Sequence, residues 1–317
     1  MSVRPKVTVG VPVFNGEAQL ALALESLILQ DHPSFEVVIS DNGSTDGTRA
    51  ICEAYAARDP RVSYHRYGDN RGASWNFNNV VTLAAGEYFM WGAHDDMWAP
   101  GCLSGYARAL DEDPRAVLVY CHAQPIDSRG APNGPLYSEF VNDHPDRRVR
   151  WRRLLENWPL HVAIYGMMRM DAVEKTRLIR NCAACDIVFM SELVLHGKTL
   201  ELPDVLSWKR VPDAGTSYRT VQEQIEYLDP SKSVGKRARF LRWRAIRECL
   251  KGLRHAEADR QAALTLDALG IYCARHLSTD VKEEVSRVMR SYPRLLAGLR
   301  WPFRSGRTER RFGDRQG

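Results

Sequence analysis

Residues 35–48 read FEVVISDNGSTDGT, in which a short apolar run ends in a dense group of turn-forming residues. A continuous apolar run of this length is typical of a strand buried on both faces of a parallel sheet. Asp, Asn, Gly, Ser and Thr directly after it favour a tight turn and the start of a helix. The stretch therefore predicts a strand over residues 35–40, a polar loop at its carboxyl end, and a helical stripe that begins near Ile51.

The neighbouring segments continue this alternation of strand and helix. Residues 6–14 are rich in β-branched side chains, and Leu20, Leu24, Leu27 and Ile28 share one face of a predicted helix. Further strands are predicted at residues 62–66, 87–91 and 116–120, and further helices at residues 73–85 and 100–110. Such alternation builds an α/β fold with a Rossmann-like, mostly parallel sheet and helices on both faces. In these sheets ligands bind beyond the carboxyl ends of the strands.

The second half of the chain is less regular. Residues 122–147 are polar and rich in Pro, Gly, Asn and Asp, which predicts a long functional loop. Helices are then predicted at 147–157, 171–179 and 186–196, with a strand at 161–170. From about Ser231 the pattern is all-helical, and the last dozen residues, from Ser305, are expected to be disordered. We therefore expect a main domain over residues 1–220 and a basic helical C-terminal extension over residues 221–317.

Charge is unevenly distributed along the chain. The 317 residues include 44 Lys and Arg and 39 Asp and Glu, for a net charge of +5. Residues 232–317 hold 21 of the basic and 9 of the acidic residues, which leaves 23 and 30 in residues 1–231. The basic tail has two interpretations, a solvated or packed helical face and attraction to an anionic membrane surface. Apolar and Arg side chains interleave over residues 294–304, as in interfacial segments, whereas no nucleic-acid-binding module is visible.

The location expected from the sequence is cytoplasmic, and under the membrane interpretation of the tail it is peripheral on the inner face of the cell membrane. No apolar run approaches the roughly 20 residues that a membrane span needs, and the N-terminus lacks the pattern of a secretory signal. Seven cysteines are scattered over the chain. Their odd number and wide spacing favour reduced thiols.

Candidate functional residues follow the predicted strands. Asp41 can accept hydrogen bonds from a base N–H or a ribose hydroxyl, although Asp also opens turns for purely local reasons. Arg71, at the start of a predicted helix, suits a phosphate or is a surface arginine. Asp95 and Asp96 are adjacent carboxylates, which either bind a divalent cation or form a solvated acidic pair. Neither a dinucleotide-binding fingerprint nor a P-loop is present.

Four motifs in this order resemble the nucleotide-sugar half of the family-2 glycosyltransferases. They are VPVFN at 11–15, DNGSTDGT at 41–48, NRG at 70–72 and the acidic pair at 95–96. The resemblance is dense over residues 5–120, and DNGSTDGT is its most specific part. It implies the GT-A fold, a catalytic domain over residues 1–220, a nucleoside-diphosphate sugar as donor, and a hydroxyl-bearing glycan or lipid-linked acceptor. Most members of the family invert the configuration at the sugar carbon.

The resemblance also implies roles for individual residues. The donor-binding positions are Pro12, Phe14, Asn15, Asp41, Arg71 and Asp95. Asp41 would contact the base or ribose, Arg71 would lie near the diphosphate, and Asp95 would face the ribose or sugar. Asp96 would coordinate Mg²⁺ or Mn²⁺ between the two phosphates.

A further acidic residue is implied on the opposite side of the sugar. Family members carry an acid at the start of a helix with the downstream pattern E-L-x-x-x-G, which makes Asp186 the candidate general base and Glu192 a structural residue. Many members also offer a His after an Arg in the next stretch, as a metal or diphosphate contact. That His is missing from residues 209–212, so Lys209 or Arg210 is expected to stabilise the diphosphate instead.

The implied chemistry is direct displacement of a nucleoside diphosphate by an acceptor hydroxyl. Cationic groups stabilise the negative charge that develops on the leaving phosphate, while the base removes the proton of the hydroxyl. Two other classes stay open on the same fold. One is a non-catalytic protein that binds nucleotide sugars or glycans, and the other is a sugar nucleotidyltransferase, although the loop at 12–16 lacks the Gly-rich, basic phosphate loop of such enzymes.

Overall fold

The computed structural model describes residues 5–138, 141–157, 162–182, 184–211, 226–230 and 241–256. All of these belong to one compact unit, Met1–Asp259.

The first half of the unit alternates strands and helices as predicted. Its elements are β1 (Val7–Val13), α1 (Leu20–Ile28), β2 (Phe35–Asp41), α2 (Thr48–Arg58), β3 (Val62–Arg66), α3 (Ala73–Leu83), β4 (Tyr88–Trp91), β5 (Met97–Trp98), α4 (Cys102–Glu112) and β6 (Ala116–Ile126). The second half adds α5 (Arg147–Asn157), the 3₁₀ turn η1 (Ala163–Tyr165), β7 (Met167–Arg169), α6 (Met170–Val173), α7 (Cys185–Leu193), β8 (Lys198–Arg210) and α9 (Leu241–Ala256).

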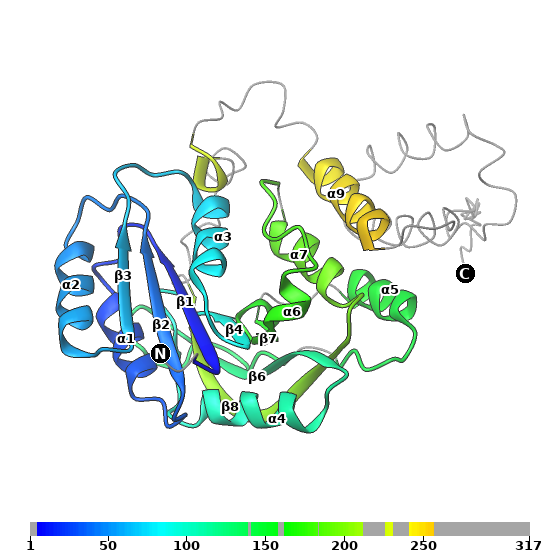
Figure 1. The fold of residues 1–317 in the computed structure, drawn as a ribbon, viewed down its shortest axis with the longest axis horizontal. Coiled ribbons are helices and arrows are strands. Elements are labelled where there is room, and N and C mark those ends of the chain that lie inside the picture. Colours follow the sequence, from blue (N-terminus) through cyan, green and yellow to red (C-terminus); the bar gives the residue numbers. More distant parts are fainter. Residues whose placement is uncertain are drawn as a thin grey trace, which may run out of the picture. The chain divides into compact units, whose positions relative to one another are not determined.

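The described strands form one mixed sheet in the order β3-β2-β1-β4-β7-β6-β8-β5 (Figure 1). β1 is parallel to both β2 and β4, β2 is parallel to β3, and β6 is parallel to β8. β7 runs antiparallel to β4 and β6, and β5 runs antiparallel to β8. After β3 the chain returns past β1 to reach β4, so the carboxyl ends of β1 and β4 flank a topological switch point, where such sheets bind ligands.

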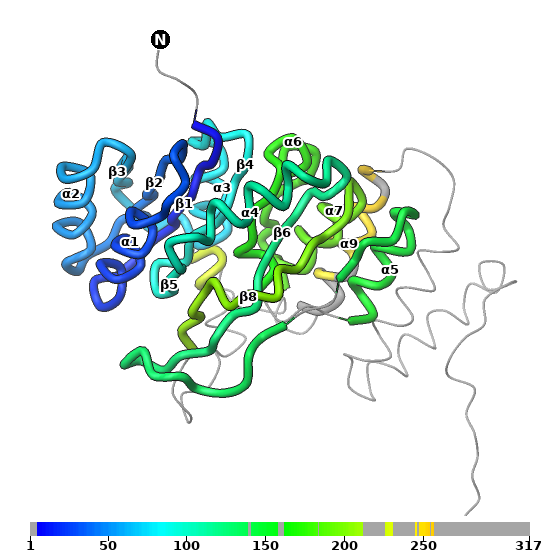
Figure 2. The backbone as a smooth tube through the Cα atoms, turned by 90° about the horizontal axis from the view of Figure 1, so that it is seen from below, coloured from blue at the N-terminus to red at the C-terminus, as the bar shows by residue number. Residues whose placement is uncertain are grey.

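Helices cover both faces of the sheet, as expected. On one face the alternate valines of β1 pack in a buried cluster with Leu24 of α1 and Leu103 of α4, and Figure 2 shows α4 in front of the strands on this side. On the other face Trp91 of β4 packs edge-on against Phe189 of α7, with ring centroids 5.0 Å apart. Gly10 of β1 lies so close to α3 on that face that an added Cβ would meet Val80.

Several elements of the second half differ from the sequence prediction. β8 was not expected, because it contains Pro203 and Asp204, both exposed, and its other, mostly half-buried residues show no clean alternation of apolar and polar side chains. β6 continues to Ile126, into the stretch predicted to be irregular. The predicted strand at 161–170 is instead η1 followed by the short β7, with His161 outside the described residues. The predicted helix at 171–179 is reduced to the single turn α6.

The described part of the predicted C-terminal extension includes α9, which packs on α7. Arg177 joins the two helices, since its guanidinium lies 2.6 Å from Glu192 of α7 and 3.1 Å from Glu248 of α9. Glu192 thus has the structural role expected of it. The remainder of the extension, including its expected disordered end, lies outside the described residues, and the division at residue 220 stays a prediction. Within the described ranges no helix has the length and apolar character to cross a bilayer.

We predict that Glu192→Gln destabilises the unit by about 3 kcal/mol, because it removes the more buried of the two carboxylates that pair with the Arg177 guanidinium. Glu192 is 2 % exposed and accepts hydrogen bonds from both the backbone N–H and the guanidinium of Arg177. Urea denaturation measures the change. Lys175→Met, which removes an exposed pair with Asp171, should have little effect. Equal stability of the two variants would contradict the prediction.

Candidate functional site

The loop after β1 and the turn after β2 are joined by side-chain hydrogen bonds. The backbone N–H of Asn15 donates to the Ser44 hydroxyl (2.9 Å), and that of Thr45 donates to the Asn15 amide oxygen (2.9 Å). The N–H of Gly16 donates to the Thr48 hydroxyl (2.8 Å). Asn15 has a positive φ of 52°, which Asn tolerates better than most residues. The small polar residues of the DNGSTDGT motif therefore hold the loop after β1 against the turn after β2 at the edge of the sheet.

Asp41 lies beneath this turn and is fully buried. One carboxylate oxygen accepts the Ser44 N–H (2.8 Å), and the other accepts the Tyr64 hydroxyl (2.7 Å) and lies 3.6 Å from Arg66. Burial, together with the hydrogen bond to Asp41, raises the pKa of Tyr64. Both oxygens of Asp41 are thus engaged within the protein, and it is the next residue, Asn42, that lines the cavity described below.

Asn42 positions the loop after β3. Its amide oxygen accepts the backbone N–H of Arg71 (3.1 Å), and its amide NH₂ donates to Asn70 (2.9 Å). The Arg71 guanidinium lies 4.7 Å from the ring centroid of Trp75 and 5.4 Å from that of Tyr67. Arg71 therefore stacks on aromatic rings beside the cavity, while its neighbour Asn70 contributes to the lining.

A cavity of about 650 Å³ opens at the carboxyl ends of β1 and β4, a volume typical of small-molecule sites. Its lining is formed by Pro12, Val13, Phe14, Asn15, Asn42, Asn70, Ala73, Asn76, Phe77, Ala93, His94, Asp95, Tyr165, Glu226, Tyr227 and Pro230. The structure thus brings together four of the predicted donor-binding residues, Pro12, Phe14, Asn15 and Asp95. Asp95 and Glu226 place two carboxylates in the lining, and within the described residues no Lys or Arg joins them.

One wall of the cavity comes from a distant segment, residues 226–230. Gly72 has a φ of +87°, and a Cβ added there would overlap the carbonyl oxygen of Leu228. The Asn181 amide donates to the Asp229 carboxylate over 2.6 Å and so fixes the segment from the opposite side. Gly72 is therefore required both for its backbone conformation and for the close approach of this wall.

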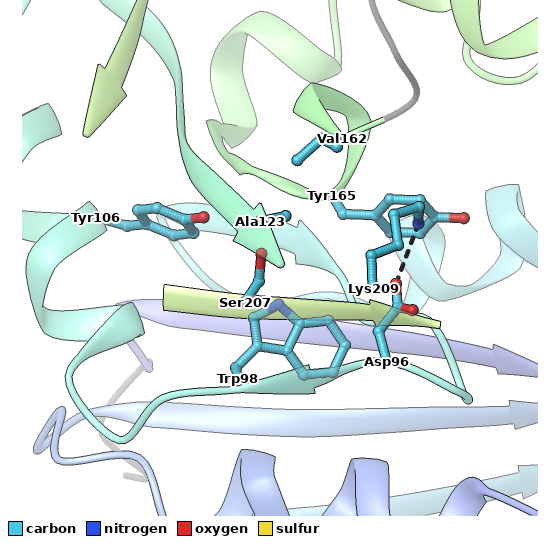
Figure 3. A pocket seen from close by; sticks show the side chains of 8 residues that line it. All are labelled: Asp96, Trp98, Tyr106, Ala123, Val162, Tyr165, Ser207 and Lys209. Carbon is cyan, nitrogen blue, oxygen red and sulfur yellow. Dashed lines mark hydrogen bonds and ion pairs between the residues drawn. The ribbon is translucent and has the colours of Figure 1, made fainter. Parts of the chain in front are cut away.

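Asp96 lies beside a second, much smaller cavity (Figure 3). The residue is 4 % exposed. One carboxylate oxygen is 3.1 Å from the Lys209 ammonium, and the other accepts the backbone N–H of Arg210 over 2.8 Å. The Lys209 ammonium also lies 3.9 Å from the ring centroid of Tyr165. Burial raises the pKa of the Asp96 carboxyl, and the Lys209 charge opposes that shift.

Arg210 links the loop after β4 to the end of β6. Its guanidinium donates to the carbonyl oxygens of Asp95 (3.1 Å) and Asp127 (2.6 Å). These contacts hold Asp95 and Asp96 in place from the end of β8. The diphosphate contact expected of Arg210 stays a prediction.

Asp186 is half-buried in the first turn of α7. It lines neither cavity, but its charge acts on Tyr165, which lines both. Burial raises the pKa of Tyr165 well above its usual value, and the charges of Asp96, Asp95 and Asp186 add to that shift. The charges of the three predicted acids thus act on one residue, Tyr165, which sequence reasoning missed because it lay inside a predicted strand.

The residues around Asp96 do not fit a divalent cation as they stand. Both oxygens of Asp96 are engaged, so a cation would have to displace the Lys209 ammonium. No group of three or more His, Cys, Asp or Glu that could hold a metal ion occurs in the described part of the chain. In nucleotide sites Mg²⁺ needs only one or two carboxylates besides phosphate oxygens and water, so the pairing of Asp96 with Lys209, and not the number of acidic residues, is what disfavours a cation here.

Comparison with known proteins identifies the family. A family model described as glycosyl transferase family 2 matches residues 8–177. The chain belongs to glycosyltransferase family 2. An uncharacterised glycosyltransferase of Rickettsia typhi is 31 % identical over 165 residues, which are 51 % of this chain and 48 % of the relative. The GalNAc(5)-diNAcBac-PP-undecaprenol beta-1,3-glucosyltransferase of Campylobacter jejuni is 30 % identical over 118 residues, 37 % of this chain and 38 % of the relative. The matches thus span about half or less of these relatives.

Solved structures of similar fold cover most of the chain. S. aureus TarS 1–349 in complex with UDP-GlcNAc matches with a TM-score of 0.62 and 19 % identity over 92 % of this chain and 79 % of that chain. A mannosyltransferase from Pyrobaculum calidifontis in complex with GDP-Man and Mn²⁺ matches with a TM-score of 0.51 and 21 % identity over 93 % and 87 %. These likenesses confirm the expected α/β fold of the GT-A type for this family-2 glycosyltransferase.

We predict that Gly72→Ala disturbs the cavity wall, because the new Cβ meets backbone atoms of residues 228 and 229 at a positive φ. The expected effects are a loss of stability of about 2 kcal/mol and faster hydrogen exchange of residues 226–230. Gly68→Ala is the matched control, since no atom lies within 4 Å of its added Cβ. Unchanged exchange in the Gly72 variant would show that this contact does not hold the wall.

Proposed function

We propose that this family-2 member is an inverting glycosyltransferase that moves a hexosyl or deoxyhexosyl group from a nucleoside-diphosphate sugar to a hydroxyl acceptor. The observation that carries the proposal is the cavity at the carboxyl ends of β1 and β4, where the loops expected to bind the donor meet. A glycan, glycolipid or cell-envelope intermediate is the proposed acceptor. The names of the relatives support this class, among them a putative teichuronic acid biosynthesis glycosyltransferase of Bacillus subtilis.

The nucleoside is proposed to bind between the loops after β1, β2 and β3. Phe14 is 40 % exposed at the cavity and offers a flat surface to a base. Asn15, Asn42 and Asn70 supply amide groups that can both donate and accept hydrogen bonds with base and ribose. Asp95 and Tyr165 lie farther along the lining, toward Asp96, which makes them the proposed neighbours of the sugar.

The proposed reaction is direct attack of the acceptor hydroxyl on the anomeric carbon. Asp186 removes the hydroxyl proton, and the bond from the sugar to the diphosphate oxygen breaks as the new glycosidic bond forms. The configuration inverts because no enzyme nucleophile intervenes. Lys209 and Arg71 are the proposed cations for the departing diphosphate, together with the N-terminus of α3, whose N-cap Gly72 provides no side-chain cap.

The divalent cation that the resemblance implies at Asp96 is not part of this proposal, because both oxygens of Asp96 are already engaged. The Pyrobaculum calidifontis mannosyltransferase was solved with GDP-Man and Mn²⁺, and family members commonly use such an ion, so Mg²⁺ or Mn²⁺ is the cofactor that the resemblance implies. No step of the proposed reaction requires it.

We predict that Asp186→Asn retains nucleotide-sugar binding and lowers turnover at least about 100-fold, since the amide cannot accept the hydroxyl proton. Calorimetry with UDP-, GDP- and dTDP-sugars measures binding, and release of nucleoside diphosphate measures turnover. Asp171→Asn, at the first turn of α6, is the control and should resemble the wild-type protein.

The same experiment separates the alternatives. Binding without turnover in the wild-type protein would favour a non-catalytic nucleotide-sugar-binding protein. Release of pyrophosphate from a nucleoside triphosphate and a sugar phosphate would favour a nucleotidyltransferase. Unchanged turnover in Asp186→Asn would remove Asp186 from the role of base.

We also propose peripheral attachment of the basic tail to the cytoplasmic face of the membrane, where lipid-linked acceptors would be available. Replacing Arg294, Arg300 and Arg304 by Gln in the full chain should reduce flotation with vesicles that contain phosphatidylserine. Vesicles of phosphatidylcholine alone are the control. Equal flotation of wild-type and variant chains with the anionic vesicles would contradict the proposal.

A further inference from the structure

We propose that Lys209 is the resident cation at Asp96 and that a nucleoside diphosphate binds to this protein without a divalent metal ion. The inference rests on the proposed function, because it concerns the diphosphate of the same donor. It departs from the metal site that the family resemblance implies.

Both carboxylate oxygens of Asp96 already have a partner within the protein. The ammonium of Lys209 lies 3.1 Å from one carboxylate oxygen, and the Arg210 N–H lies 2.8 Å from the other. A buried carboxylate satisfied by one full positive charge and one backbone donor has no electrostatic need for a second cation. A metal ion would therefore have to break the ion pair and leave the ammonium, 19 % exposed in its side chain, without its counter-charge.

The described lining of the neighbouring large cavity carries negative charge. Its lining includes the carboxylates of Asp95 and Glu226 and, among the described residues, neither Lys nor Arg. A diphosphate that enters needs a positive charge close by. We assign this charge to Lys209, which lines the small cavity and whose ammonium lies 3.9 Å from the ring centroid of Tyr165, a residue of both linings.

The ammonium group of a lysine can donate hydrogen bonds to two anions at once. Lysine carries three N–H donors on a flexible stem. In Figure 3 the Lys209 ammonium points to Asp96 along one direction and lies beside the Tyr165 ring along another. One donor directed to Asp96 leaves two others, which we assign to a phosphate oxygen of the bound nucleotide. Asp96 then acts as the residue that positions Lys209.

The test is calorimetric titration of the full chain with UDP and with GDP, once in EDTA and once in Mg²⁺ or Mn²⁺. We expect the dissociation constant of the preferred nucleotide to be the same within about threefold in both buffers. Lys209→Met should weaken binding at least about tenfold, the effect of losing a charge-assisted hydrogen bond. Lys198→Met is the matched control, because Lys198 also forms a partly buried pair, with Asp113, outside both cavities. It should bind like the wild-type protein.

Direct titration with Mn²⁺, followed by electron paramagnetic resonance, supplies a second readout. The wild-type protein should show no stoichiometric Mn²⁺ site with or without nucleotide. Stoichiometric Mn²⁺ binding, nucleotide affinity that collapses in EDTA, or unchanged affinity in Lys209→Met would each overturn the inference and leave the proposed function intact. Absence of nucleotide binding in every buffer would overturn both.

Discussion

The buried carboxylate of Asp96 ties together the two halves of the sheet. It follows β4, in the parallel half, and its two oxygens are bound by consecutive residues at the end of β8, in the mixed half. Burial of a carboxylate is costly unless it is paired and hydrogen-bonded, so this contact determines where the loop after β4 lies. Arg210 reinforces the link through the carbonyl oxygens of Asp95 and Asp127. The position of Asp95 at the cavity, and of Tyr165 between the cavities, follows from it.

Acidic residues that look equivalent in the sequence have different roles in the structure. Asp41 belongs to the most specific motif of the chain. Its carboxylate accepts hydrogen bonds from Ser44 and Tyr64 and pairs with Arg66, so both oxygens are engaged within the protein. The motif DNGSTDGT is mainly an internal hydrogen-bond network that shapes two loops, and Asn42 is its contribution to the cavity lining. Asp95, by contrast, lies in the lining itself.

The fold was predicted best where secondary structure depends on residues that are close together in the sequence. Apart from the two-residue β5, which was not predicted, the strands and helices up to β6 follow from local apolar patterns and turn residues, and their predicted bounds agree to within a few residues except at the end of β6. β8 was missed because Pro203, Asp204 and half-exposed side chains hide its pattern. The sequence predicted that the site is formed by loops at the strand ends. It did not predict the side-chain contacts between those loops. Lys209 and Asp96 are 113 positions apart, and only the folded sheet brings them together.

The wall formed by residues 226–230 docks on Gly72 largely through its own main chain, at the carbonyl oxygen of Leu228 and the Cα of Asp229. Glu226, Tyr227 and Pro230 meanwhile turn toward the cavity. The segment is thus held by its backbone at Gly72 and by the Asp229 carboxylate, which accepts the hydrogen bond from Asn181. Substitutions at Glu226, Tyr227 or Pro230 would therefore alter the shape and charge of the cavity while the contacts at Gly72 and Asp229 still hold the segment.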